Sequence, residues 1–324
     1  MITTASTATR QKAARQARVT HSMSDITLSI KIDVDTDRGT RLGVPNLLAL
    51  FDEFGVKATF LFSLGPDNTG RAIKRIFRPG FFSKVSRTSV VSVYGIRTLL
   101  NGVLLPGPHV GRRNEAVMRL ARDRGHEPGI HCYDHIRWQD GLMKMSENEV
   151  RQEFGKARQE FERVFGEPAR TAGAAGWQAN ALSLAAYDAA KLLYASDARG
   201  SHPFFPRADG RTFRTLQVPT TLPTLDELLG RPDYPEERLV EHYLSLLRPG
   251  VPNILTIHAE LEGMKFLPLF RRLLEQARAR SIRFVLLRDL AADLLKDPSP
   301  LPVCDLVGGT VDGRSGTLAV QKCP

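Results

Sequence analysis

The sequence lacks any long apolar run. Nowhere do about 18 apolar residues follow one another, so no segment is predicted to cross a bilayer as a helix. The first stretch, Met1 to about Ser24, is rich in Thr, Ala, Arg and Gln and has no apolar centre. We therefore expect neither a signal peptide nor a membrane anchor there, and we interpret residues 1–24 as a disordered tail.

Cysteine is scarce as well. The chain has three, Cys132, Cys304 and Cys323, and the last two lie in a mixture of Pro, Gly and Val that we interpret as an irregular tail over residues 297–324. Three cysteines placed in this way do not predict a disulfide framework, so a reducing compartment is the simpler inference.

Acidic residues are absent from one long segment. Residues 68–114 contain no Asp or Glu, whereas the whole chain carries 35 of them against 45 Lys and Arg, a net charge of +10. Aromatic and aliphatic residues separate the cations, as in elements that place apolar groups among lipid tails and cations at the phosphates. The side chains predicted to dock on a membrane are Lys74, Arg75, Phe77, Arg78, Phe81, Phe82 and Lys84.

Two other interpretations of this insertion stay open. It could be a pair of helices packed on the rest of the domain, or it could be a dimer interface. A nucleic-acid surface is disfavoured, because the segment is too aliphatic and lacks aromatic side chains interleaved for base stacking. The positive net charge calls for an anionic partner, and an anionic membrane surface is the one that this composition favours.

Strand-like and helix-like segments alternate along the rest of the chain, and 324 residues with 42% hydrophobic content suffice for one large core. Strands are expected near 26–33, 58–63, 127–131, 169–173, 192–196, 213–218, 253–258 and 282–286. Helices are expected near 44–54, 114–124, 147–165, 179–190, 236–247, 266–280 and 288–295. This order predicts an α/β domain over residues 25–296, with a parallel sheet closed or nearly closed into a distorted (β/α) barrel and the basic insertion between strands 2 and 3.

Two pairs of polar residues follow strand-like runs. Asp33 and Asp35 end the first strand, and His131 and His135 follow the third. Each spacing alone occurs by chance, since such aspartates often serve in turns and a half-buried His is often satisfied by a carbonyl. Together they predict a site of two histidines and one carboxylate for one catalytic divalent metal, with zinc, manganese, cobalt and iron all open.

A third polar position ends another strand. His258 stands at the tip of Asn253-Ile-Leu-Thr-Ile-His258, where it would face the same rim as the metal ligands. A strand-end histidine is commonly structural, so both roles stay open. Cys132 lies between the two histidines, and its side chain should point away from the metal if the imidazoles converge.

With Ile32-Asp33-Val34-Asp35, His131…His135 and Thr256-Ile257-His258, the chain resembles the polysaccharide deacetylase family (NodB homology, carbohydrate esterase family 4) over most of residues 26–295. Segments 63–68, 174–177, 196–200 and 219–227 look like the subgroup that deformylates 4-deoxy-4-formamido-L-arabinose on undecaprenyl phosphate. That enzyme acts in the lipid A modification that gives polymyxin resistance, so the resemblance implies a peripheral protein on the cytoplasmic face of the bacterial inner membrane.

The resemblance also implies roles for individual residues. Asp35, His131 and His135 would hold the metal, Asp33 would be the general base, and His258 would be the general acid that protonates the leaving amine. The oxyanion would lie between the metal and a backbone N–H near residues 131–135. The residues expected to contact the substrate are Asn68, Arg71, Trp177, Asp197 and Arg199.

The sequence departs from the family at the residues before Trp177. Many members have Arg and Pro there, whereas this chain has Ala174, Ala175 and Gly176. The partner that orients the base is therefore open, and Arg199 is a candidate, although its neighbour Asp197 could simply hold it in a surface salt bridge. Trp177 itself could line the sugar site or pack in the core.

Two further functions stay open beside the deformylase. One is an N-deacetylase of another glycan, against which the basic insertion counts. The other is a non-catalytic scaffold that binds anionic lipid, against which the intact aspartates and histidines count.

Overall fold

The fold is organised around a curled sheet of eight parallel strands, in a computed structural model that describes residues 26–72 and 98–323. The sheet order is β10-β1-β2-β3-β4-β5-β8, and β9 pairs with β1. The strands are β1 (Thr27–Val34), β2 (Thr59–Ser63), β3 (Glu127–Cys132), β4 (Thr171–Ala172), β5 (Tyr194–Ala195), β8 (Leu216–Gln217), β9 (Asn253–His258) and β10 (Arg283–Phe284). The sequence prediction of a distorted (β/α) barrel is confirmed.

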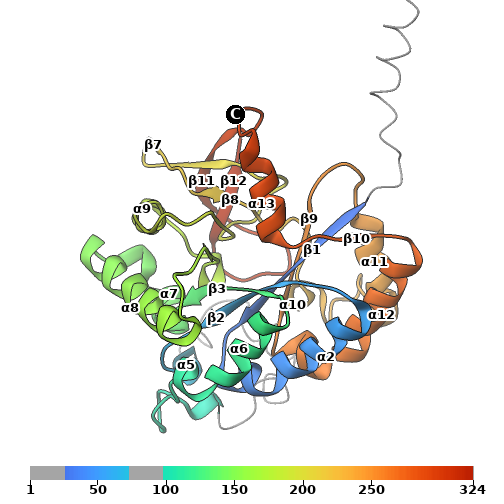
Figure 1. Ribbon diagram of the computed structural model, residues 1–324, viewed down its shortest axis with the longest axis horizontal. Coiled ribbons are helices and arrows are strands. Elements are labelled where there is room, and N and C mark those ends of the chain that lie inside the picture. The colour runs from blue at the N-terminus through green and yellow to red at the C-terminus, as the bar shows by residue number, and fades with distance from the viewer. Residues whose placement is uncertain (1–25, 73–97, 324) are drawn as a thin grey trace, which may run out of the picture.

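Helices cover the outside of this sheet (Figure 1). The main ones are α2 (Val44–Phe54), α6 (Glu115–Asp123), α8 (Glu147–Phe165), α9 (Ala181–Ala190), α11 (Leu239–Leu246), α12 (Leu267–Ala279) and α13 (Leu287–Lys296). The short ones are α5 (Val110–Arg113), α7 (His135–Gly141) and α10 (Leu225–Leu228), with single turns η1 (Gly39–Gly43), η3 (Leu142–Lys144), η4 (Ala175–Trp177), η5 (Glu236–Arg238) and η6 (Leu261–Lys265).

Local sequence signals set the ends of two helices where the sequence predicted them. In α2, Pro45 stands in the first turn, and Gly55 follows the last residue with φ 66°, a conformation that side chains rarely adopt. In α8, Ser146 and Glu149 form a reciprocal capping box at the start. These helices bury apolar faces against the sheet, whose strands β1 and β2 are buried along nearly their whole length.

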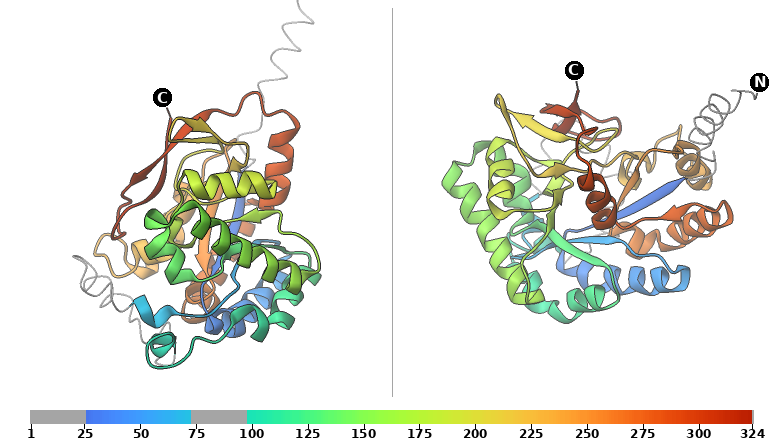
Figure 2. Two further views of the ribbon diagram at one scale, coloured as in Figure 1. Left: turned by 90° about the vertical axis from the view of Figure 1, so that its left-hand side faces the viewer. Right: turned by 45° about the horizontal axis from the view of Figure 1, so that its top comes forward.

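The C-terminal segment is not irregular, and that prediction is wrong. Here β11 (Val303–Gly309) and β12 (Leu318–Lys322) form a hairpin that joins β6 (Phe205–Ala208) and β7 (Arg211–Thr212) in a four-stranded sheet of order β12-β11-β6-β7. Figure 2 shows this sheet at one end of the molecule, beside the chain's C-terminus. Its strands are short and partly polar, and β6 lies about a hundred residues earlier, so local patterning does not reveal the pairing.

The cysteine prediction is wrong for the same reason. Cys304 and Cys323 face each other across the hairpin and form a disulfide. Cys132 is the free cysteine, and it is buried. The placement of the cysteines therefore does not by itself indicate a reducing compartment.

The insertion lies between β2 and β3, as predicted, but most of it falls outside the described residues. This applies to every predicted docking side chain: Lys74, Arg75, Phe77, Arg78, Phe81, Phe82 and Lys84. On its described flank, Val103, Leu104 and Leu105 are exposed. Within the described ranges, no helix has the length and apolar character needed to span a bilayer.

Candidate functional site

The predicted site residues meet because neighbouring parallel strands end at the same edge of the sheet. Asp33 near the end of β1 pairs in register with His258 at the end of β9. His131 lies near the end of β3, two strands from β1, and His135 opens α7 directly after it. Residues far apart in the chain thus come together at one rim.

Asp35, His131 and His135 form a compact group of ligand atoms. Asp35 Oδ1 lies 3.2 Å from His131 Nε2 and 3.4 Å from His135 Nε2. Among the described residues, no group donates a hydrogen bond to this buried oxygen. Burial raises the pKa of the Asp35 carboxyl, but the two imidazoles outweigh it and hold that pKa well below its usual range.

The surroundings of His131 suit a metal ligand. Its Nδ1 lies 2.7 Å from the carbonyl oxygen of Gly173, which accepts the N–H and leaves the Nε2 lone pair turned toward Asp35. Two imidazole nitrogens and one carboxylate oxygen that accepts no hydrogen bond are a set of ligand atoms that suits a divalent metal. Cys132 does not join them, because its buried Sγ lies 3.3 Å from Ser63 Oγ.

A buried lysine stands beside the predicted base. Lys31 Nζ lies 3.5 Å from Asp33 Oδ1 and donates a hydrogen bond of 3.1 Å to the carbonyl oxygen of Ser196. The lysine side chain has no exposed surface; burial lowers its pKa, and the charges of Asp33 and Asp197 oppose that shift. Lys31 therefore occupies the place beside the base for which the sequence suggested Arg199.

The backbone of His258 is fixed by a hydrogen bond, whereas its ring Nδ1 makes none within the described residues. Its N–H donates to Glu262 Oε2 at 2.9 Å, and its buried Nδ1 meets no partner within the described part of the chain. Burial lowers the pKa of this imidazole, but carboxylates led by Asp226 and Asp35 raise it above the usual value. The histidine therefore retains its proton to higher pH than an ordinary one.

Two buried glutamates support the loops of the rim. Glu260 Oε1 accepts hydrogen bonds from the N–H groups of Asp35 and Thr36, at 3.1 Å and 2.9 Å, and so fixes the turn after β1. Burial, then the nearby Asp35, raises the pKa of Glu260 to about 8. Burial raises the pKa of Glu262 to about 7.

Trp177 lies beneath the site and is almost wholly buried. Its ring is 6.3 Å from the His258 ring and 5.3 Å from Lys31 Nζ, and Arg314 stacks on it at 4.3 Å. The residue has φ 53°, which is rare for a bulky side chain, and its indole N–H donates to Thr220 Oγ1. Trp177 is therefore packed in the core, as one of the two interpretations expected, and its ring lies against that of His258.

Asp197 and Arg199 make their polar contacts with different partners rather than with each other. Arg199 forms an ion pair of 2.5 Å with the buried Glu227, so it is not part of an exposed salt bridge. Asp197 has no exposed surface and accepts hydrogen bonds from the Ala174 N–H and the Gln217 amide, while burial raises its pKa to about 6. Both side chains thus position the loops beneath the rim rather than line its surface.

The two predicted contacts near the insertion differ in exposure. Asn68 is buried and donates from Nδ2 to Asp134 Oδ2 at 2.6 Å, beside His135. Arg71 is exposed, and its Nε donates to the Gly102 carbonyl oxygen. Arg71 can therefore meet an anionic group directly, whereas Asn68 holds the start of α7.

Sequence patterns missed several supporting residues: Lys31, Glu260, Glu262, Glu227 and Arg314. One signal was available. Lys31 lies two positions before Asp33 in a strand, so both side chains point to the same side, and a lysine inside an otherwise buried strand needs a partner. Arg314 gives no such signal, since it lies in the hairpin loop between β11 and β12.

Comparison with known proteins adds independent information. A family profile described as polysaccharide deacetylase matches residues 31–194. A Shewanella sediminis (strain HAW-EB3) protein named "Probable 4-deoxy-4-formamido-L-arabinose-phosphoundecaprenol deformylase ArnD" is 37% identical, over 91% of this chain and 94% of that protein. A Wigglesworthia glossinidia brevipalpis protein of the same name is 31% identical, over 88% and 98%.

Solved structures share the fold. A Mycobacterium smegmatis protein described as a polysaccharide deacetylase matches with TM-score 0.62 and 17% identity, over 90% of this chain and 96% of that one. A Pseudomonas aeruginosa PAO1 protein described in the same way gives 0.56 and 16%, over 84% and 91%. At these identities the likeness concerns the fold.

Proposed function

The chain belongs to the polysaccharide deacetylase family and is a hydrolase of carbon–nitrogen bonds other than peptide bonds, and on this premise we propose its substrate and mechanism. The substrate is 4-deoxy-4-formamido-L-arabinose linked to undecaprenyl phosphate. Hydrolysis of its formamide releases formate and the 4-amino sugar lipid, which serves lipid A modification and polymyxin resistance. The names of the two curated relatives support this substrate.

The observation that carries the proposal is the grouping of Asp35, His131 and His135 at the rim where Asp33 and His258 also lie, with an Asp33 oxygen and His258 Nδ1 that make no hydrogen bond within the described residues. Asp35, His131 and His135 would hold a divalent metal (zinc, manganese or cobalt), whose positive charge would polarise the formamide carbonyl and lower the pKa of the attacking water. Asp33 accepts the proton of that water, with Lys31 fixing the orientation of its carboxylate. His258, with its raised pKa, donates a proton to the departing amine.

A direct assay tests this proposal. Purified protein, depleted of metal and then titrated with Zn²⁺, Mn²⁺ or Co²⁺, is incubated with the formamido-arabinose lipid while formate is measured. We expect one divalent ion per site and formate release that requires it. A protein that binds no metal and releases no formate would contradict the proposal and would favour the alternative of a non-catalytic scaffold that binds anionic lipid.

A second candidate, an N-deacetylase of another glycan, is favoured by the family profile. The same preparation assayed on N-acetylated glycans decides between them. Acetate release at a higher kcat/KM than formate release would select the deacetylase.

We place the protein peripherally on an anionic membrane, at the cytoplasmic face, because a prenyl-linked substrate stays in its lipid. Arg71 and the exposed flank Val103–Leu105 support this placement. Replacing Lys74, Arg75, Arg78 and Lys84 by glutamate should lower the net charge of residues 68–114 from +9 to +1 and abolish co-sedimentation with phosphatidylglycerol vesicles. Binding equal to that of the wild type would overturn the membrane assignment, and formate release from a detergent-solubilised substrate controls for folding.

A further inference from the structure

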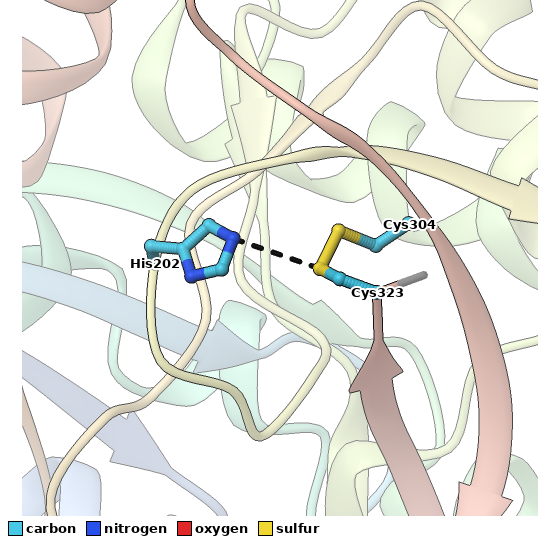
Figure 3. A group of neighbouring side chains, drawn as sticks. All are labelled: His202, Cys304 and Cys323. Carbon is cyan, nitrogen blue, oxygen red and sulfur yellow. Dashed lines mark hydrogen bonds between the residues drawn. A yellow bond between two sulfur atoms is a disulfide. The ribbon is translucent and has the colours of Figure 1, made fainter.

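A second group of metal-ligand side chains lies in the small sheet, away from the catalytic rim. Cys304 on β11 and Cys323 just after β12 form the disulfide, and His202 from the loop before β6 points its Nε2 at Cys323 Sγ over 3.6 Å (Figure 3). The three ligand atoms lie within 4.8 Å of one another. We propose that reduction of this disulfide creates a second metal site, in which two thiolates and His202 bind a thiophilic divalent cation of the zinc type.

The distances suit such a site. Zinc bonds of about 2.3 Å to sulfur and about 2.0 Å to nitrogen, at a tetrahedral angle, place the two ligand atoms about 3.5 Å apart. The observed distance between Cys323 Sγ and His202 Nε2 is 3.6 Å. The two sulfurs have to separate, to about 3.8 Å, and Cys323 is half-buried, just after the last residue of β12.

Neighbouring side chains already hold the ligands in place. Ser201 Oγ lies 2.8 Å from His202 Nδ1, where it can accept the N–H and leave the Nε2 lone pair toward the sulfurs. The Gln321 amide donates to the His202 carbonyl oxygen at 3.0 Å and lies 3.6 Å from Cys304 Sγ. Its oxygen accepts from the Ser201 N–H at 2.8 Å, so one side chain joins the loop of His202 to the hairpin.

A dithiol can reduce the Cys304–Cys323 disulfide. The dithiol gives two electrons and two protons to the disulfide, which becomes two thiols, and is itself oxidised to a disulfide. Binding of the cation then releases the two thiol protons, and the two thiolates neutralise its charge. Cys304 is buried, whereas His202 and Cys323 are half-buried, so a cation can enter from their side.

The metal would connect more segments than the disulfide does. The disulfide joins β11 to β12 only, whereas the metal also ties the loop of His202 to the hairpin. Arg199, three residues before His202, pairs through its backbone with Ala319 and Gln321 of β12. In a reducing compartment the metal would therefore hold the small sheet against the loop that carries Asp197 and Arg199.

Cobalt binding to the full chain tests the site, because a thiolate ligand gives Co²⁺ an intense near-ultraviolet charge-transfer band that the Asp35, His131 and His135 site cannot give. Wild-type protein is reduced with a phosphine, or left oxidised, and titrated with Co²⁺. We expect one additional Co²⁺ and the band in the reduced protein only, with bleaching by Zn²⁺. Equal cobalt uptake without the band in both states would show a purely structural disulfide and overturn the proposal.

Variants assign the ligands. Cys304→Ser/Cys323→Ser should abolish the band, and His202→Ala should weaken cobalt binding by about 10-fold or more. A band that persists in Cys304→Ser/Cys323→Ser would belong to Cys132 and would also overturn the proposal. The comparison of reduced and oxidised wild type needs no variant, and formate release plays no part in the readout, so failure here and failure of the proposed function are distinguishable.

Discussion

The rim of the large sheet and the small C-terminal sheet touch each other but are built in different ways. At the rim, each polar residue stands at the end of a buried parallel strand, so position in the strand decides which side chains meet. In the small sheet, β6 and β11 pair across about a hundred residues, and the polar contacts come from a hairpin loop. The comparison teaches that the rim gathers the proposed reacting groups, whereas the small sheet contacts the layer beneath them through Arg314, which stacks on Trp177.

The largest expected effects come from replacing one proposed metal ligand at the rim and, separately, one proposed catalytic residue that does not bind the metal. His135→Ala should lose both bound metal and turnover, whereas Asp33→Ala or His258→Ala should lower kcat by about 10²–10⁴-fold and retain the metal. Metal content by mass spectrometry and formate release measure the two effects. An Asp33→Ala variant with turnover close to that of the wild type would remove Asp33 from the role of base.

Lys31 tests whether the rim depends on a buried cation beneath it. Lys31→Met keeps the length of the side chain and removes its charge, so Asp33 loses its orienting partner. We expect kcat to fall by about 100-fold, because misplacing a reacting group by about 1 Å has that effect, while KM and metal content stay unchanged. Lys31→Arg should restore part of kcat. Loss of stability in Lys31→Met without a change in kcat would show a purely structural lysine.

Arg199 tests the junction between the two regions. Arg199→Met leaves Glu227 buried beside a more distant Arg314 at 3.7 Å, and should lower the free energy of unfolding by about 3 kcal/mol. The double variant Arg199→Met/Glu227→Gln should recover most of that loss in urea unfolding, because no unpaired charge remains. Equal instability of the single and double variants would contradict the ion-pair explanation.

His126 gives the smallest effect and lies at the other end of β3, away from both regions. Burial lowers the pKa of His126 to about 4, and its Nδ1 accepts the Ala58 N–H. A depressed histidine pKa favours the folded state while the ring is neutral, so this stability is complete above pH 6.5 and is lost as pH falls toward 4.

His126→Asn keeps an acceptor and does not titrate. Relative to this variant, the wild type should lose about 2 kcal/mol of unfolding free energy between pH 7 and pH 4.5, as measured by urea unfolding at both pH values. Parallel pH profiles for the two proteins would exclude this histidine as the cause.

Local patterns predicted the rim well and the small sheet poorly. Asp33, Asp35, His131, His135 and His258 all come directly from the ends of apolar runs, and the bounds of α2 and α8 follow from Pro, Gly and capping signals. The hairpin of residues 303–322 carries no such run, because β11 is interrupted by Asp305 and ends in two glycines, and β12 has only three apolar residues. Lys31 was missed because the function of a buried lysine depends on which carboxylate the fold places beside it.

Anomalous diffraction from crystals grown with Zn²⁺ or Mn²⁺ tests most directly whether the rim holds a metal. We predict a peak about 2.0–2.2 Å from an Asp35 carboxylate oxygen and from Nε2 of His131 and His135. A peak elsewhere, or one that excludes Asp35, would contradict the metal-dependent mechanism proposed for this rim.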